Sequence, residues 1–90
     1  MRQNKLKEAI AELDEAIRLQ PDYALAYNAR GFVYYLLRQY PRALQELDAA
    51  LRIKPDYVNA FQNRALARKA SGDAKGSAED LARAAALGRK

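Results

Sequence analysis

The sequence contains no cysteine, no histidine and no tryptophan. Without cysteine it has no disulfide framework, no thiolate ligand and no thiol redox chemistry, which is compatible with a reducing compartment, and we favour the cytoplasm. Without histidine it lacks the most frequent general base and metal ligand. No apolar run approaches the roughly 18 residues that span a bilayer, so we expect no membrane partner.

The remaining side chains do not favour an enzyme. The hydroxyl groups belong to two serines and six tyrosines, and residues 71–77 form a loop rich in small residues without a phosphate-binding glycine motif. Glu8, Glu12 and Glu15 are spaced along one helix among lysines and arginines, a pattern typical of local ion pairs. We therefore predict a noncatalytic protein with no catalytic residues, no metal site and no cofactor.

The residues that are abundant favour helix. Half of the chain is apolar, and Ala, Leu, Arg, Lys, Glu and Gln dominate. The net charge of +5 gathers in the last third, at Arg64, Arg68, Lys69, Lys75, Arg83, Arg89 and Lys90. We interpret this basic end mainly as the solvated outer face of a last helix; an anionic partner is the alternative, and a nucleic acid is not favoured.

A repeat of 34 residues is the most informative feature. It relates five pairs of residues: Leu13 and Leu47, Asp14 and Asp48, Ala16 and Ala50, Pro21 and Pro55, Tyr23 and Tyr57. A period of this length predicts a stacked array of helix pairs, in which each unit buries its apolar face against its neighbours. Such an array leaves a long curved surface free for binding.

Four breaks divide the repeat into helices. Pro21 and Pro55 end helices, and each is followed by an aspartate that we expect to cap the next helix. Pro41 suits a first helical turn, and the glycine and aspartate of residues 72–73 suit a helix end and a new N-cap. The predicted helices cover residues 5–19, 23–37, 41–53, 57–70 and 75–87.

These residues carry a family resemblance. The pattern resembles the tetratricopeptide repeat, and its members here are Tyr27, Gly31, Tyr34, Ala43, Leu47, Ala50 and Pro55. The resemblance implies an all-α fold of about five helices, with antiparallel pairs stacked as a right-handed solenoid. It implies a single domain over residues 1–90, with a half repeat at 1–23, a full repeat at 24–57 and a degenerate terminal repeat at 58–90. Arg30 and Arg64 depart from it, because the family usually has leucine there.

Two sets of residues should hold the stack together. Gly31 is expected where the helices of a pair cross, with Ala43 and Ala50 opposite. Arg30 and Arg64 recur with the period, as do acidic residues at positions 12, 46 and 80 and at positions 14 and 48. We expect a ladder of guanidinium and carboxylate pairs between adjacent helices, with Arg64 bound by Glu46, Asp48 or Asp80.

The resemblance also implies a binding groove on the first helix of each pair. The residues expected to line it are Leu25, Asn28, Phe32, Tyr35, Asn59, Gln62, Leu66 and Lys69. Amide side chains could bond a peptide backbone there, and aromatic rings could supply apolar contacts. Alternatively, Phe32 and Tyr35 pack against a second copy or a further repeat.

Two functional hypotheses follow. The leading one is a protein interaction module that binds a peptide or helical segment in the groove. The alternative is a self-assembly unit or a fragment of a longer scaffold protein, because the first helix lacks the partner that would complete its pair. Its strip of Leu6, Ala9, Ile10, Leu13 and Ile17 is expected to be bare on one flank and to join a homodimer.

Overall fold

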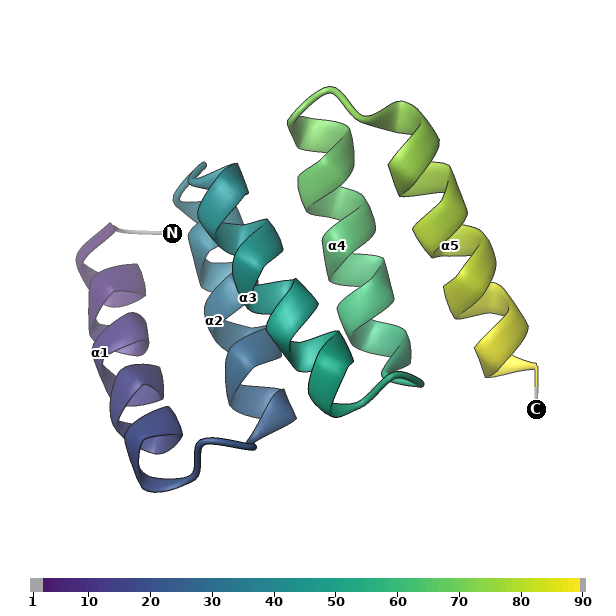
Figure 1. The fold of residues 1–90 in the computed structure, drawn as a ribbon. Coiled ribbons are helices and arrows are strands. Elements are labelled where there is room, and N and C mark those ends of the chain that lie inside the picture. Colours follow the sequence, from purple (N-terminus) through teal and green to yellow (C-terminus); the bar gives the residue numbers. More distant parts are fainter. Residues whose placement is uncertain (1–2, 90) are drawn as a thin grey trace.

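The computed structural model describes residues 3–89, which form five helices and no strand. The helices are α1 (Gln3–Leu19), α2 (Ala24–Leu36), α3 (Tyr40–Ile53), α4 (Val58–Ala70) and α5 (Ala74–Gly88). They agree with the predicted helices to within two residues at each end, and the expected all-α stack is confirmed (Figure 1).

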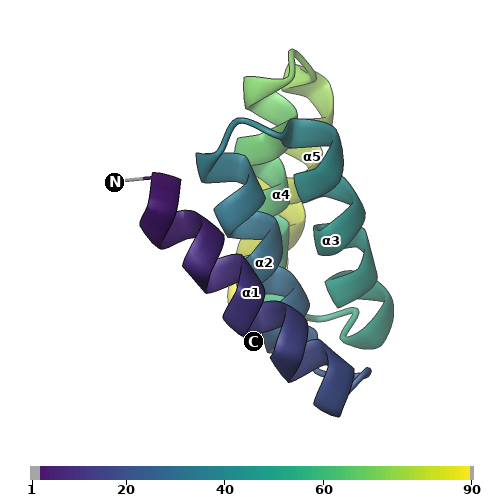
Figure 2. The ribbon, with the colours of Figure 1, turned by 90° about the vertical axis from the view of Figure 1, so that its left-hand side faces the viewer.

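The helices pack as two antiparallel pairs with one additional helix. α2 packs on α3 and α4 packs on α5, while α3 and α2 both contact α4 and so join the pairs. α1 packs on α2 at the other end, where it crosses in front of that helix (Figure 2). α2 is therefore covered by three helices and lies at the centre of the stack.

The crossing of α2 and α3 depends on Gly31. A Cβ atom at this position would lie 2.8 Å from Cγ of Leu47 and 3.2 Å from the carbonyl oxygen of Ala43. Both of these residues are fully buried. The two helices can approach this closely only because one of them has no side chain at the crossing. This confirms the crossing at Gly31 with Ala43 opposite, although the nearest side chain is that of Leu47 rather than Ala50.

The helix starts differ from the expectation at two of the four turns. Asp22 and Asp56 do not cap α2 and α4: the N-caps are Tyr23 and Tyr57, and neither makes a side-chain capping bond. The chain turns tightly at each proline, with the amide of Tyr23 donating to the carbonyl of Gln20 (3.1 Å), so the aspartate falls one residue too early. Asp73 does cap α5, because its carboxylate accepts a bond of 2.8 Å from the amide of Gly76.

Two equivalent helix ends use the left-handed backbone conformation. Gly72 follows α4 with φ of +95°, and Arg38, which occupies the same place in the repeat, follows α2 with φ of 62°. In each turn the next amide bonds back to the helix, as in the 2.9 Å bond from Gln39 to the carbonyl of Tyr34. Arginine is strained in this conformation, whereas glycine is not.

We expect Arg38→Gly to stabilise the fold by about 1 kcal/mol, because it removes the Cβ strain of the left-handed conformation. The increase would appear as a higher urea midpoint with an unchanged slope. Gly72→Arg in the equivalent turn is the matched control and should lower the midpoint. A lower midpoint for Arg38→Gly would show that contacts of the arginine side chain stabilise the fold by more than its left-handed backbone conformation destabilises it.

The α1 strip is less exposed than expected. Leu6 is only 4% exposed, and Ile10 packs against the core cluster formed by Tyr34, Ala43, Leu47 and Ala67. Ala9, Leu13 and Ile17 are half-buried. The expectation of a bare strip is therefore wrong for Leu6 and Ile10, which are covered within a single chain, whereas Ala9, Leu13 and Ile17 remain only partly covered.

Candidate functional site

A hollow lies between the two first helices, α2 and α4. Its volume is about 370 Å³, and its lining residues are Leu25, Asn28, Ala29, Phe32, Tyr57, Asn59 and Asn63. Leu25 is 54% exposed at the edge. The hollow lies where α2 and α4 contact each other directly, and Ala29 contributes only a methyl group to its lining.

Three asparagines form the polar part of the hollow. The amide of Asn28 donates to Oδ1 of Asn59 (2.9 Å), and the amide of Asn63 donates to Oδ1 of Asn28 (3.0 Å). Asn28 and Asn63 are buried, and Asn59 is exposed at the rim. Asn63 also donates to Oδ1 of Asn59, so the three side chains form one hydrogen-bonded network that links α2 to α4.

The eight residues predicted for the groove do not all meet in this hollow. Four of them line it, namely Leu25, Asn28, Phe32 and Asn59. Lys69 lines a second, smaller hollow with Ala74, Ser77, Ala78 and Leu81. Tyr35, Gln62 and Leu66 line neither, although the ring of Tyr35 stacks on that of Phe32 with centroids 5.9 Å apart.

Sequence reasoning omitted three residues of the hollow: Ala29, Tyr57 and Asn63. Ala29 and Asn63 are separated by one repeat period, and this equivalence in the sequence could have indicated that both face the same groove. Tyr57 precedes α4 and reaches the hollow from a turn, with its hydroxyl 3.4 Å from the amide of Asn28. A groove defined by helix faces alone could not include it.

A ladder of ion pairs binds the helices together, as predicted. Arg30 contacts the carboxylates of Asp14 (2.6 Å) and Glu46 (2.5 Å), which lie 16 residues before and after it. Arg64 repeats the arrangement with Asp48 (2.9 Å) and Asp80 (2.8 Å). Each arginine of a first helix thus links the second helix of the preceding pair to the second helix of its own pair.

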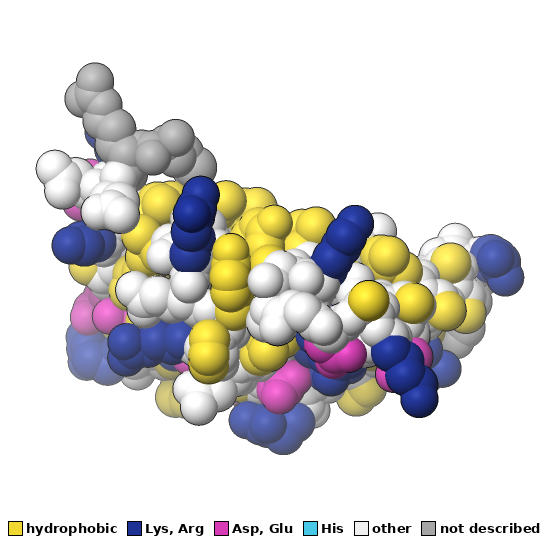
Figure 3. Space-filling model, turned by 90° about the horizontal axis from the view of Figure 1, so that it is seen from above, with side chains coloured by type: hydrophobic (Ala, Val, Ile, Leu, Met, Phe, Trp, Pro, Cys, Tyr) yellow, Lys and Arg dark blue, Asp and Glu magenta, His cyan; other side chains and the backbone are white. Residues whose placement is uncertain are grey.

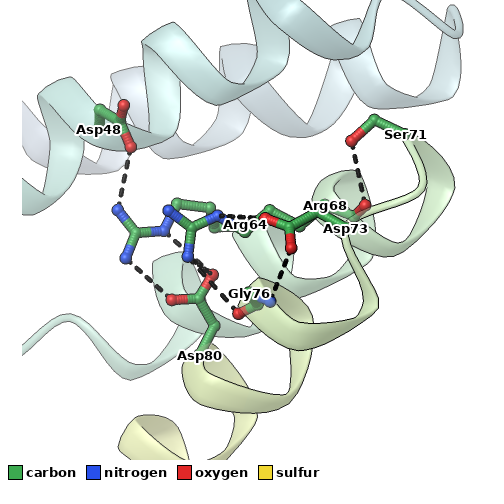
Figure 4. A network of polar contacts seen from close by, with 7 residues as sticks. All are labelled: Asp48, Arg64, Arg68, Ser71, Asp73, Gly76 and Asp80. Carbon is green, nitrogen blue, oxygen red and sulfur yellow. Dashed lines mark hydrogen bonds and ion pairs between the residues drawn. The ribbon is translucent and has the colours of Figure 1, made fainter.

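Asp80 is the most buried acid of the ladder, at 3% exposed. Nε and Nη2 of Arg64 both donate to it, and Nη1 of Arg68 adds a third bond of 3.0 Å (Figure 4). Seen along the helices, apolar side chains gather in the upper half of the molecule, and most acidic side chains lie in the lower half beside Lys and Arg (Figure 3).

The arginines of the ladder remain charged. The hydrogen bond to Asp80 raises the pKa of Arg64 and outweighs the opposing effect of burial, and the bond to Asp48 raises it further. Burial alone would lower the pKa of Arg30, but its bonds to Glu46 and Asp14 more than offset this and raise the pKa. Both groups are therefore permanent cations at any pH at which the protein is folded.

Residues 3–89 contain neither a candidate metal site nor a candidate membrane-spanning helix. In this part of the chain no acidic cluster is placed to hold a metal ion. None of the described helices is both long and apolar enough to cross a bilayer.

Comparisons with known proteins agree with the geometry. One family model described as a TPR repeat matches residues 1–37, and a second, described as the tetratricopeptide repeat, matches residues 24–57. No curated protein matches the sequence.

Solved structures of MamA have a similar fold. One is 27% identical with a TM-score of 0.87, and another is 28% identical with a TM-score of 0.84. A MamA double mutant, 24% identical with a TM-score of 0.81, shows the same fold. Each match covers 94% of this chain but only 46–50% of the MamA chain, so the present chain spans about half of their length.

The family models, the helix pairing and the glycine at the helix crossing all describe the same kind of unit. Such units are in general noncatalytic modules of protein interaction and scaffolding. Residues 1–57 of this chain therefore consist of tetratricopeptide repeats.

Proposed function

We propose that the chain is a noncatalytic interaction module that binds an apolar peptide or helical segment of another protein in the hollow between α2 and α4. The observation that carries the proposal is the combination of exposed Leu25 and half-buried Phe32 around a buried asparagine network. In the unit division that we propose, the hollow lies between the full repeat at 24–57 and the terminal repeat at 58–90.

The two parts of the hollow would contribute differently to binding. Leu25 and Phe32 provide apolar area that a ligand can remove from water, worth about 1 kcal/mol or more for each well-packed anchor. Asn59 is exposed at the rim and bonds to the exposed Gln62 outside it, and both amides can bond the backbone of the ligand. Since Asn28 and Asn63 already bond each other, the hollow does not have to rearrange, which lowers the entropic cost of binding.

The proposal is tested by selecting peptides that bind the 90-residue chain from a random library and measuring their affinity by calorimetry. We expect Phe32→Ala and Leu25→Ala each to weaken binding about tenfold or more, which corresponds to about 1.4 kcal/mol. Both side chains lie outside the buried core clusters, so thermal stability should change little.

Leu66→Ala is the matched control, because Leu66 is 43% exposed on α4 and lies outside the hollow. Unchanged affinity for this variant places the ligand in the hollow. Equal losses for Leu25→Ala and Leu66→Ala would support the wider groove of eight residues. Peptides that bind all three variants as tightly as the unchanged chain would refute both.

Self-assembly is the second candidate, and the exposure of Leu81 (52%) on α5 and of Leu66 (43%) on α4 favours it. A second copy, as in a homodimer, could cover these side chains. Light scattering over a dilution series tests it, with Leu81→Lys as the variant. A mass that is independent of concentration would rule out this role.

A further inference from the structure

α1 is the second helix of a pair whose first helix is absent from the described residues. Its residues Ala9, Leu13, Ala16 and Ile17 are equivalent to Ala43, Leu47, Ala50 and Leu51 of α3. The four residues of α3 are buried, because α2 covers them on one side and α4 on the other. The four residues of α1 are only half-buried, because α2 alone covers them.

The ladder has an unfilled position on the same helix. Glu12 is equivalent to Glu46 and Asp80, the two acids that each receive the arginine of their own first helix. Glu12 is exposed, and among residues 3–89 it has no ion-pair partner. Asp14, two residues further along α1, is already bound to Arg30 of α2.

The helix crossing specifies a further requirement. Leu13 is equivalent to Leu47, against which Gly31 packs so closely that a Cβ atom would clash. A helix that crosses α1 in the same way needs a small residue opposite Leu13. In α2 this small residue directly follows the arginine of the ladder, as Arg30 and Gly31.

We propose that the outer face of α1 binds an amphipathic partner helix that carries an arginine followed by glycine or alanine. The arginine pairs with Glu12, the small residue crosses Leu13, and apolar side chains of the partner cover Ala9 and Ile17. Complementary charge selects this occupant, because the acids equivalent to Glu12 in the two other units are each paired with an arginine of a first helix. A second copy of the chain fits poorly, because Arg30 and Arg64 are already bound within their own stack.

The opposite end of the stack does not offer an equivalent site. The acids at positions 14 and 48, which receive the arginine of the following unit, are replaced by Ala82 in α5. An arginine-bearing helix therefore has a carboxylate to pair with at the α1 end and none at the corresponding position of α5. The partner should bind one end of the stack only.

A synthetic peptide with the sequence of residues 22–39 is a suitable probe, because it contains Arg30 and Gly31 in their native context. We expect the fluorescently labelled peptide to bind the 90-residue chain in an anisotropy titration. Glu12→Gln in the protein should weaken binding about tenfold, the loss expected for one charge-assisted pair at a partly covered site. Glu8→Gln on the same helix is the control and should leave the affinity unchanged, and neither change affects a buried group.

Peptide variants make the test specific. Replacing Arg30 by Gln or Gly31 by Leu in the peptide should each weaken binding, and Glu12→Arg in the protein should be rescued by Arg30→Glu in the peptide. Equal affinities for the unchanged protein and Glu12→Gln would overturn the proposal. So would loss of binding in Phe32→Ala, which would place the peptide in the α2 and α4 hollow, or a protein that forms dimers broken by Glu12→Gln.

Discussion

Replacing Gly31 by Leu should lower the stability of this chain by several kcal/mol. The new side chain would enter the crossing of α2 and α3, where even a Cβ atom would lie 2.8 Å from Leu47. Overpacking of a core costs about 1–3 kcal/mol, and we expect the upper end or more because the backbone of Ala43 also blocks the site. The loss would be a large fraction of the roughly 5–10 kcal/mol expected for a domain of this size.

Ala29→Leu is the matched control, since it adds a similar side chain to the same helix two residues away. Ala29 is half-buried and lines the hollow, where space is available. Thermal melts followed by circular dichroism should show a decrease of well over 10 °C for Gly31→Leu and only a few degrees for Ala29→Leu. Equal melting temperatures would mean that the helices do not cross at Gly31.

The second large effect should come from Arg64→Ala. This change removes two of the three hydrogen bonds to the nearly buried carboxylate of Asp80 and the link to Asp48. Breaking a buried ion pair by removing one partner costs about 3–5 kcal/mol, and we expect the lower part of this range because Arg68 still reaches Asp80. Urea unfolding should therefore show a clearly lower midpoint.

Two comparisons separate the ion pair from a general effect of losing an arginine. Arg83→Ala on the exposed face of α5 should change stability by less than about 0.5 kcal/mol. The double variant Arg64→Met with Asp80→Leu should recover part of the loss, because it leaves no buried carboxylate without its arginine, and Arg68 keeps its contact with Asp73. A loss for Arg64→Ala no greater than that for Arg83→Ala would contradict the ladder.

The features that depend on the repeat period were predictable from the sequence. The period relates residues that must occupy the same environment, so helix bounds, the Gly31 crossing and the spacing of Arg64 from its acids followed from equivalence. These contacts join neighbouring helices, and the register between neighbours is set by the repeat itself.

Features that depend on the distance between helices were not predictable in the same way. The bond between Asn28 and Asn63 requires α2 and α4 to meet directly, although they belong to different pairs. The coverage of Leu6 depends on how far α1 leans over α2, which an apolar strip does not specify. Asp22 and Asp56 were expected to be N-caps. Because of the tight turn after each proline, the N-cap is instead the next residue, Tyr23 or Tyr57.

The ladder also determines which parts of the chain can open separately. α3 contributes Glu46 to Arg30 and Asp48 to Arg64, so local unfolding of α3 would break ion pairs of both arginines at once. α1 is tied to the ladder by the exposed Asp14 alone, whereas α5 is tied by buried Asp80 with two arginines. Amide hydrogens of α1 should accordingly exchange with solvent through small openings that leave the other helices intact, while those of α3 should exchange only when the whole stack unfolds.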